Sequence, residues 1–231
     1  MTTVIECHEI SKRFGKKVAN NKISLSVEAG DIYGLVGRNG SGKTTLIKQF
    51  MGSLIPTSGW LKFFDSPKLD QGRKRIGFLS DLSYFAHLSG AENLEYFACL
   101  EGIKDKQQIV RLMKHWDLDP KDKKQYRQYS TGMKQKLALS AAMLGNPDVL
   151  VLDEPINGLD PVSINHFRET MLTLQKEQGT TIFVSSHILS ELAMMCTRFG
   201  FLENGSLVEE LTREELHSKV QSALKLKTTD P

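Results

Sequence analysis

This sequence has no apolar run long enough to cross a membrane as a helix. Its uninterrupted apolar strings, such as residues 149–152, are short, whereas a spanning helix needs about 20 residues. The first residues carry acidic side chains and are not followed by an apolar segment with a small-residue cleavage site, so we expect no secretory signal. These absences predict a soluble protein that would reach a membrane only through a partner.

Cysteine and net charge are also scarce. The three cysteines, Cys7, Cys99 and Cys196, lie far apart with no C-x-x-C spacing and no zinc-ligand pattern. We expect them to be buried or half-buried in a reducing compartment. The 30 basic and 27 acidic residues nearly cancel, which argues against a dedicated nucleic-acid binder, although a local basic patch stays possible.

The 231 residues, of which 40% are hydrophobic and 25% charged, suit one globular domain with an attached lobe. Short apolar or β-branched segments alternate with helical patterns in the first and last thirds, which predicts a largely parallel sheet. The predicted strands are residues 4–10, 23–27, 32–36, 60–64, 75–79, 149–152, 180–185 and 199–202. The predicted helices outside the middle third are residues 43–51, 161–178 and 188–196, and one opened by Thr212-x-x-Glu215.

The middle of the chain, residues 82–145, reads instead as a helical lobe inserted into the α/β core. Ser89-x-x-Glu92 is a capping box that opens a helix through residue 100, and helical patterns follow at 106–116 and 130–144. We therefore predict one domain over residues 1–220 with this lobe inside it, and a polar, loose tail over 221–231. Asn204-Gly205 predicts a hairpin.

The strongest chemical motif is the segment 37–44, which fits G-x-x-x-x-G-K-[ST] between a predicted strand and a helix. Glycines there let backbone N–H groups converge on phosphate oxygens, the lysine reaches the β and γ phosphates, and the threonine hydroxyl can bind Mg²⁺. The predicted phosphate-binding residues are Gly37, Asn39, Gly40, Ser41, Gly42, Lys43, Thr44 and Thr45.

A second motif is the apolar strand 149–152 followed by Asp153 and Glu154. Carboxylates at the C-terminal edge of a parallel sheet lie where ligands bind in such folds. Asp153 is suited to hold Mg²⁺ and Glu154 to polarise an attacking water. These two motifs leave several classes of nucleotide hydrolase open, although the guanine-reading N-K-x-D of small GTPases is missing from the second half.

The segment from Tyr129 to Lys136, sequence YSTGMKQK, resembles the signature sequence of the ABC ATPase family, in the variant found in antibiotic and peptide exporters. The resemblance covers about residues 4–218. It implies a P-loop NTPase core with a mostly parallel sheet, an N-terminal antiparallel β subdomain and the inserted helical lobe. It also implies that Ser130 and Gly132 contact the ATP of a second subunit.

Further segments are similar to other family motifs. Phe14 and Val18 match the adenine-stacking loop, Asn157-Gly158-Leu159-Asp160 the loop between the two ATPase subunits, and His187 the switch histidine that contacts the γ-phosphate beside Glu154. Asp81 stands where the family has a glutamine that senses Mg²⁺, and we expect it to reach the metal through a water. Ser80 replaces a proline of that loop, and Arg38 replaces a proline of the phosphate loop.

The resemblance therefore implies an ATPase that uses ATP and Mg²⁺, with Glu154, His187 and Lys43 in catalysis. Its partners would be membrane-spanning subunits and a second copy or a homologous ATPase, on the inner face of the cell membrane, with no nucleic acid. The implied task is export of a peptide, antibiotic or drug. Two alternatives stay open: a non-transport ABC ATPase acting on DNA or ribosomes, and a low-turnover nucleotide-binding scaffold or sensor.

Overall fold

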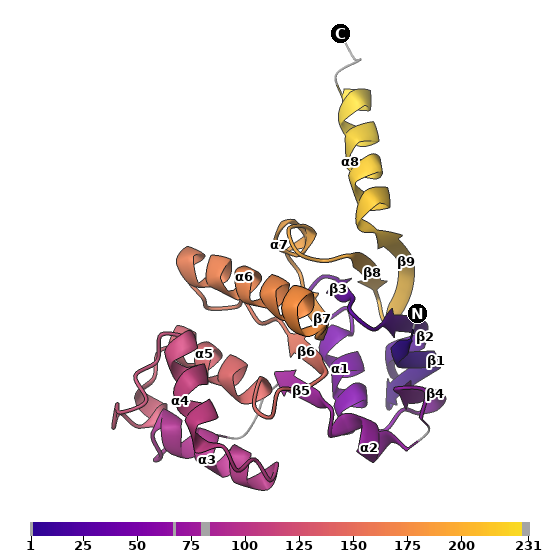
Figure 1. Cartoon of the computed structure of the whole chain (residues 1–231). Coiled ribbons are helices and arrows are strands. Elements are labelled where there is room, and N and C mark those ends of the chain that lie inside the picture. The colour runs from indigo at the N-terminus through magenta and orange to yellow at the C-terminus, as the bar shows by residue number, and fades with distance from the viewer. Residues whose placement is uncertain (1, 67, 80–83, 228–231) are drawn as a thin grey trace.

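The computed structural model describes residues 2–66, 68–79 and 84–227, and a six-stranded sheet lies at its centre (Figure 1). The strand order is β5-β6-β7-β3-β8-β9. Its strands are β5 (Ile76–Leu79), β6 (Val149–Asp153), β7 (Thr181–Ser186), β3 (Ile32–Val36), β8 (Arg198–Glu203) and β9 (Ser206–Thr212). All neighbours pair in parallel except β8 and β9, which form the hairpin predicted at Asn204-Gly205. The predicted α/β fold class is confirmed.

A second, antiparallel sheet is built by the N-terminal segment. Its order is β2-β1-β4, with β1 (Thr3–Phe14), β2 (Lys17–Glu28) and β4 (Ser58–Phe63). The first two strands are longer than predicted, because their pairing continues through several register shifts. Such bulges bend and twist a strand without ending it, so hydrophobic alternation alone marks only the middle of each strand.

The core fills both faces of the central sheet. On one face, Phe50 of α1 (Lys43–Met51) makes an edge-on contact with Phe183 of β7 at 5.4 Å between ring centroids. On the other face, Phe167 and Met171 of α6 (Pro161–Gln178) pack against strands β6 and β7. Burying a side chain such as Phe50 contributes about 1.5–3 kcal/mol. Coverage on both faces explains why β6 reads as an unbroken apolar string.

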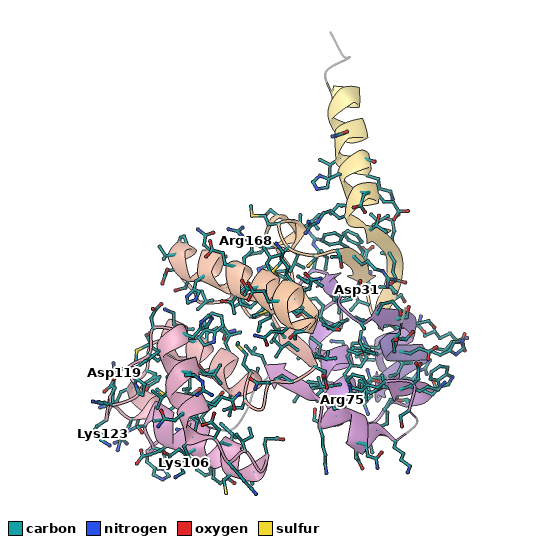
Figure 2. All side chains as sticks on the ribbon, viewed as in Figure 1. Asp31, Arg75, Lys106, Asp119, Lys123 and Arg168 are labelled. Atoms are coloured by element: carbon teal, nitrogen blue, oxygen red, sulfur yellow. The ribbon has the colours of Figure 1, made fainter. Side chains whose placement is uncertain are left out.

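The predicted helical lobe consists of α3 (Gly90–Leu100), α4 (Lys106–His115), a 3₁₀ turn (Tyr126–Gln128) and α5 (Thr131–Ala142), around its own apolar cluster. The capping box of Ser89 and Glu92 is present as predicted. Lys106, Asp119 and Lys123 lie on the outer side of the lobe (Figure 2). At its inner side α5 approaches β5 so closely that a Cβ on Gly77 would lie 1.9 Å from the Ala142 carbonyl oxygen.

Three helices differ clearly from the predictions. Helix α2 (Leu69–Arg73) was not predicted, because one turn containing Gly72 is too short to show helical periodicity. Helix α7 (Leu189–Ala193) is shorter than predicted, since a turn through Met195 leads directly into β8. Helix α8 (Arg213–Lys227) begins at its predicted cap but continues through residues 221–227, where a loose tail was predicted, and extends away from the rest of the chain (Figure 1).

The cysteines are free, and Cys7 and Cys196 are buried as predicted. Burial raises the pKa of the Cys7 thiol to about 12 and that of Cys196 still further above its usual range. The prediction was wrong for Cys99, which is exposed on α3 because it lies on the face of that helix away from the lobe's apolar cluster. Within the described ranges, no helix combines the length and the apolar character needed to cross a bilayer.

Candidate functional site

The phosphate-binding motif forms a loop between the end of β3 and the start of α1. The Gly37 N–H donates to the Ser186 carbonyl at 3.2 Å, which ties the loop to β7. Gly42 has φ 110°, and a Cβ there would lie 2.5 Å from the Ala19 carbonyl oxygen. Only glycine adopts this conformation without strain, so the loop can turn sharply into α1. The N-terminus of α1 then presents its unpaired N–H groups and positive dipole end to the space in front of the loop.

Most of the predicted phosphate-binding residues border one hollow of about 380 Å³. Its lining includes Asn39, Gly40, Gly42, Lys43, Thr44, Thr45, Val18 and Glu154. Gly37 and Ser41 face an adjoining hollow of about 500 Å³, which His187 and Arg38 also line. Ser41 is buried, and among the described residues its hydroxyl has no hydrogen-bond partner. The loop therefore carries a buried polar atom that an external ligand can satisfy.

Lys43 is almost fully buried, with 5% of its side chain exposed. Its ammonium donates to the Gly37 carbonyl oxygen at 2.6 Å and lies 3.1 Å from Oε1 of Glu154. A buried cation needs such oxygens, because burial without a partner is costly. In this conformation the lysine is paired with the acid across the loop, and an incoming phosphate would compete for the same ammonium.

The two predicted acids lie at the end of β6, beside the end of β7. Ser185, the register partner of Asp153, donates its hydroxyl to Oδ1 of Asp153 at 2.6 Å and accepts the N–H of Glu154 at 3.0 Å. Glu154 has φ 47°, a left-handed conformation that costs a non-glycine residue of order 1–3 kcal/mol. Such strain persists only where the surroundings hold the backbone in place, and it is common at functional sites.

His187 follows β7 directly, and its Nδ1 lies 2.9 Å from Oε2 of Glu154. The Glu154 carboxylate is thus held between a lysine on one oxygen and a histidine on the other. Its side chain is 16% exposed, so it retains a small opening to solvent. A carboxylate in this position can accept a proton from a water molecule, and the histidine can form a hydrogen bond to a carboxylate oxygen or to a phosphate oxygen.

The signature segment starts α5, and Ser130 is the N-cap of that helix, accepting the Met133 N–H at 3.2 Å. Ser130 and Gly132 border a separate hollow of about 370 Å³, which shares no lining residue with the hollow of the phosphate loop. Asp160, the N-cap of α6, also lines it, and hydrogen bonds from Ser163 lower the pKa of the Asp160 carboxyl. The chain therefore does not bring its own signature residues to its own phosphate loop.

Gln135 of the signature segment connects the lobe to the acidic end of β6. Its side-chain amide donates to the Pro155 carbonyl at 2.8 Å, and the Glu154 carbonyl lies 3.4 Å away. The sequence did not predict this contact or the bridging role of Ser185, because each joins residues of two different elements. The sequence signal that could have drawn attention to Ser185 is a serine near the end of a buried predicted strand, two residues before His187.

Other predicted residues lie elsewhere. Phe14 is 48% exposed near the tip of the β1–β2 hairpin and does not line the 380 Å³ hollow of the phosphate loop, although Val18 of the same hairpin does. Lys17, Ala19, Asn204 and Gly205 line that hollow and were not predicted to do so. The Gly205 N–H donates to the Ser41 carbonyl at 2.9 Å, which brings the β8–β9 turn to the loop. Asp81 and Ser80 lie outside the described residues.

Comparison with known proteins gives three findings. The sequence model of the ABC transporter family matches residues 20–157. The bacitracin transport ATP-binding protein BcrA of Enterococcus faecalis is 39% identical over 95% of this chain and 72% of its own length. The lantibiotic transport ATP-binding protein SrtF of Streptococcus pyogenes is 32% identical over 90% of each chain.

Among solved structures, the dimeric post-hydrolysis state of the ATP-binding cassette MJ0796, bound to ADP and phosphate, aligns with a TM-score of 0.81. The alignment covers 90% of this chain and 98% of that chain at 21% identity. At this identity the likeness concerns the fold.

Proposed function

Since this chain belongs to the ABC transporter family, in which it is an ATP-binding and ATP-hydrolysing subunit, we propose that it drives the export of an antibiotic peptide or a similar drug through separate membrane subunits. ATPases of this family act together with such subunits. The cargo proposal is supported by relatives named for the transport of bacitracin and of a lantibiotic.

The observation that carries the site assignment is the meeting of Lys43 and His187 on the two oxygens of the Glu154 carboxylate, beside the phosphate loop. We assign Lys43 to the β and γ phosphates of ATP, replacing its present contact with Glu154. Glu154 then accepts a proton from the water that attacks the γ-phosphorus, the bond to ADP breaks, and His187 holds the transferred phosphoryl group. Positioning and charge stabilisation supply most of the catalysis in such reactions.

The residues present fit a magnesium ion. Thr44 offers an exposed hydroxyl at the start of α1, and Asp153 offers a carboxylate at the end of β6. Within the described part of the chain, no group of three or more His, Cys, Asp or Glu side chains is arranged to hold a metal. One carboxylate and one hydroxyl suit Mg²⁺, which takes its remaining ligands from water and substrate phosphates. When bound, the ion neutralises charge on the phosphate oxygens. Asp81 stays proposed as an indirect ligand through water.

The adenine would stack on Phe14 and contact Val18, since stacking needs only an exposed aromatic face and Phe14 is exposed near the tip of the β1–β2 hairpin. Ser130 and Gly132 are assigned to the nucleotide of a second subunit. The separation of their hollow from the phosphate loop supports this assignment, as does the dimeric assembly named for MJ0796. The proposed dimer holds ATP between the phosphate loop of one copy and the signature of the other.

We place the assembly at the inner face of the cell membrane, with the chain bound peripherally to its membrane subunits and with no nucleic acid partner. The test is copurification of the tagged chain from its own cells after mild detergent extraction. A multi-span membrane protein that copurifies, together with cargo resistance lost in Glu154→Gln, is the expected result. Recovery of ribosomes or DNA instead would favour a non-transport ATPase, and absence of ATP turnover would favour a sensor.

A further inference from the structure

Ser185 carries two hydrogen bonds that hold the two acids of the site at once. Its hydroxyl proton goes to Oδ1 of Asp153 at 2.6 Å, and its oxygen lone pair receives the Glu154 N–H at 3.0 Å. The serine is completely buried, although it lies in a strand whose other central residues are apolar or β-branched. A buried hydroxyl whose donor and acceptor both go to adjacent acids has a more specific task than filling space.

We propose that Ser185 is a positioning residue for ATP hydrolysis, which sets the Asp153 carboxylate for Mg²⁺ and the Glu154 side chain for the attacking water. The proposal rests on the function proposed above. Ser185 itself touches neither nucleotide nor water, and acts only through the two acids.

The two hydrogen bonds act on different properties of the site. The bond to Oδ1 fixes the rotation of the Asp153 carboxylate, whose terminal torsion angle otherwise has a broad distribution. It leaves Oδ2 for the metal or its water. The bond from the Glu154 N–H supports a backbone at φ 47°. Without it, that N–H loses its partner and the strained residue can relax, which carries its carboxylate away from the water.

Nucleotide binding without metal should not be weakened by loss of this hydroxyl. The phosphate loop is tied to β7 through the backbone carbonyl of Ser186, which accepts the Gly37 N–H. The lysine of the loop is held by Gly37 and Glu154. Neither contact involves the Ser185 side chain, and a displaced Glu154 carboxylate would only free Lys43 for phosphate. The loss of the hydroxyl should therefore appear in metal dependence and turnover, and should not weaken metal-free affinity.

The experiment compares Ser185→Thr with Ser185→Val, which have nearly the same shape and differ in the hydroxyl. Any crowding of the buried site by the added methyl groups is shared by both variants. Ser140→Ala is the control for the loss of a buried hydroxyl, because Ser140 is equally buried and, among the described residues, its hydroxyl bonds only to the Lys136 carbonyl within α5. Each protein is measured for thermal melting, for ATP affinity in EDTA, for the Mg²⁺ concentration that half-saturates ATP binding, and for kcat and KM.

We expect Ser185→Val to lower kcat at least about 30-fold and to raise the half-saturating Mg²⁺ concentration at least about fivefold. Its ATP affinity in EDTA should be no more than about twofold weaker than that of the wild type. Ser185→Thr should keep both properties within about threefold, and Ser140→Ala should change neither.

Equal kcat and equal Mg²⁺ dependence in the valine and threonine variants would overturn the proposal, as would a loss of metal-free ATP binding in Ser185→Val alone. The metal readout separates this inference from the proposed function. A wild-type protein without turnover would refute the proposed function, yet a Mg²⁺ shift confined to Ser185→Val would still support the positioning role.

Discussion

Replacing Glu154 by glutamine keeps the size of the side chain and removes its charge, so it tests two consequences of the site at once. The first concerns chemistry. An amide cannot accept the proton of the attacking water, and loss of a positioned base lowers kcat by a factor of at least ~10².

The second consequence concerns ATP affinity, because Glu154 also pairs with the buried ammonium of Lys43 at 3.1 Å. The gross attraction at that distance is about 5 kcal/mol for an effective dielectric constant of 20. Desolvation offsets much of this in the free protein. If one third of the attraction, about 1.7 kcal/mol, becomes available to ATP, the variant binds ATP roughly 20-fold more tightly. The glutamine also removes repulsion between the carboxylate and the γ-phosphate.

The assay measures ATP affinity by calorimetry in a Gly132→Asp background, which keeps dimerisation from contributing to affinity, and turnover by phosphate release with Gly132 intact. His187→Ala is the matched control. It removes the other contact of the Glu154 carboxylate but leaves the pair with Lys43, so turnover should fall while ATP affinity stays within about twofold. ATP binding in Glu154→Gln that is no tighter than in the parent would refute the competition between Glu154 and phosphate. Near-normal turnover, with contaminating ATPase excluded, would refute the role as base.

Three further predictions concern Lys43, the signature residue Gly132, and His115, which contacts Thr170 of α6 where the helical lobe meets the core. Lys43→Ala should weaken ATP binding at least ~10-fold and abolish hydrolysis while keeping a cooperative melting transition, so unchanged calorimetric affinity and turnover would contradict its assignment. Light scattering of Glu154→Gln with ATP should show a dimer, which the added substitution Gly132→Asp prevents. Equal masses for the proteins with and without Gly132→Asp would contradict the signature assignment. Because a Cβ on Gly132 would lie 3.1 Å from the Gly158 carbonyl oxygen, melting curves must accompany this test. Partial burial and the neighbouring His166 lower the pKa of His115, so the folded state binds fewer protons than the unfolded chain. The contribution of His115 to stability is present above a pH of about 6.5 and is lost as pH falls through the folded pKa. A melting temperature that falls as much in His115→Phe as in the parent between pH 7.5 and 5.5 would contradict this prediction.

Local sequence signals predicted those parts of the fold that depend on local chemistry. The helix after the phosphate loop starts at Lys43 and ends at Met51 as predicted, because Gly42 and Gly52 both adopt left-handed conformations that bracket it. The helix between Asp160 and Gly179 likewise has its cap, its Pro161 and its left-handed end in the predicted places. Such signals involve neighbours in the chain and need no knowledge of packing.

The contacts within the site could be predicted only in part, because they join elements that are distant in the sequence. The motifs identified Lys43, Glu154 and His187, but not that the lysine and the histidine both contact the Glu154 carboxylate. The hydroxyl of Ser185 and the turn at Gly205 lie in the site because of the order in which the strands pair. Apolar alternation in the sequence does not specify that order. The exposure of Cys99 was missed for a related reason, since helical periodicity does not say which neighbour covers which face.

The hydrogen bond from Gln135 to the carbonyl of Pro155 has a mechanical consequence. Helix α5 carries the signature residues at its first turn and also, through Gln135, holds the peptide that follows Glu154. A rotation of the lobe would therefore displace that peptide, and with it the strained backbone of Glu154. The rate of ATP consumption would then report the orientation of the lobe, so that a membrane subunit pushing on the lobe could set that rate without contacting the nucleotide.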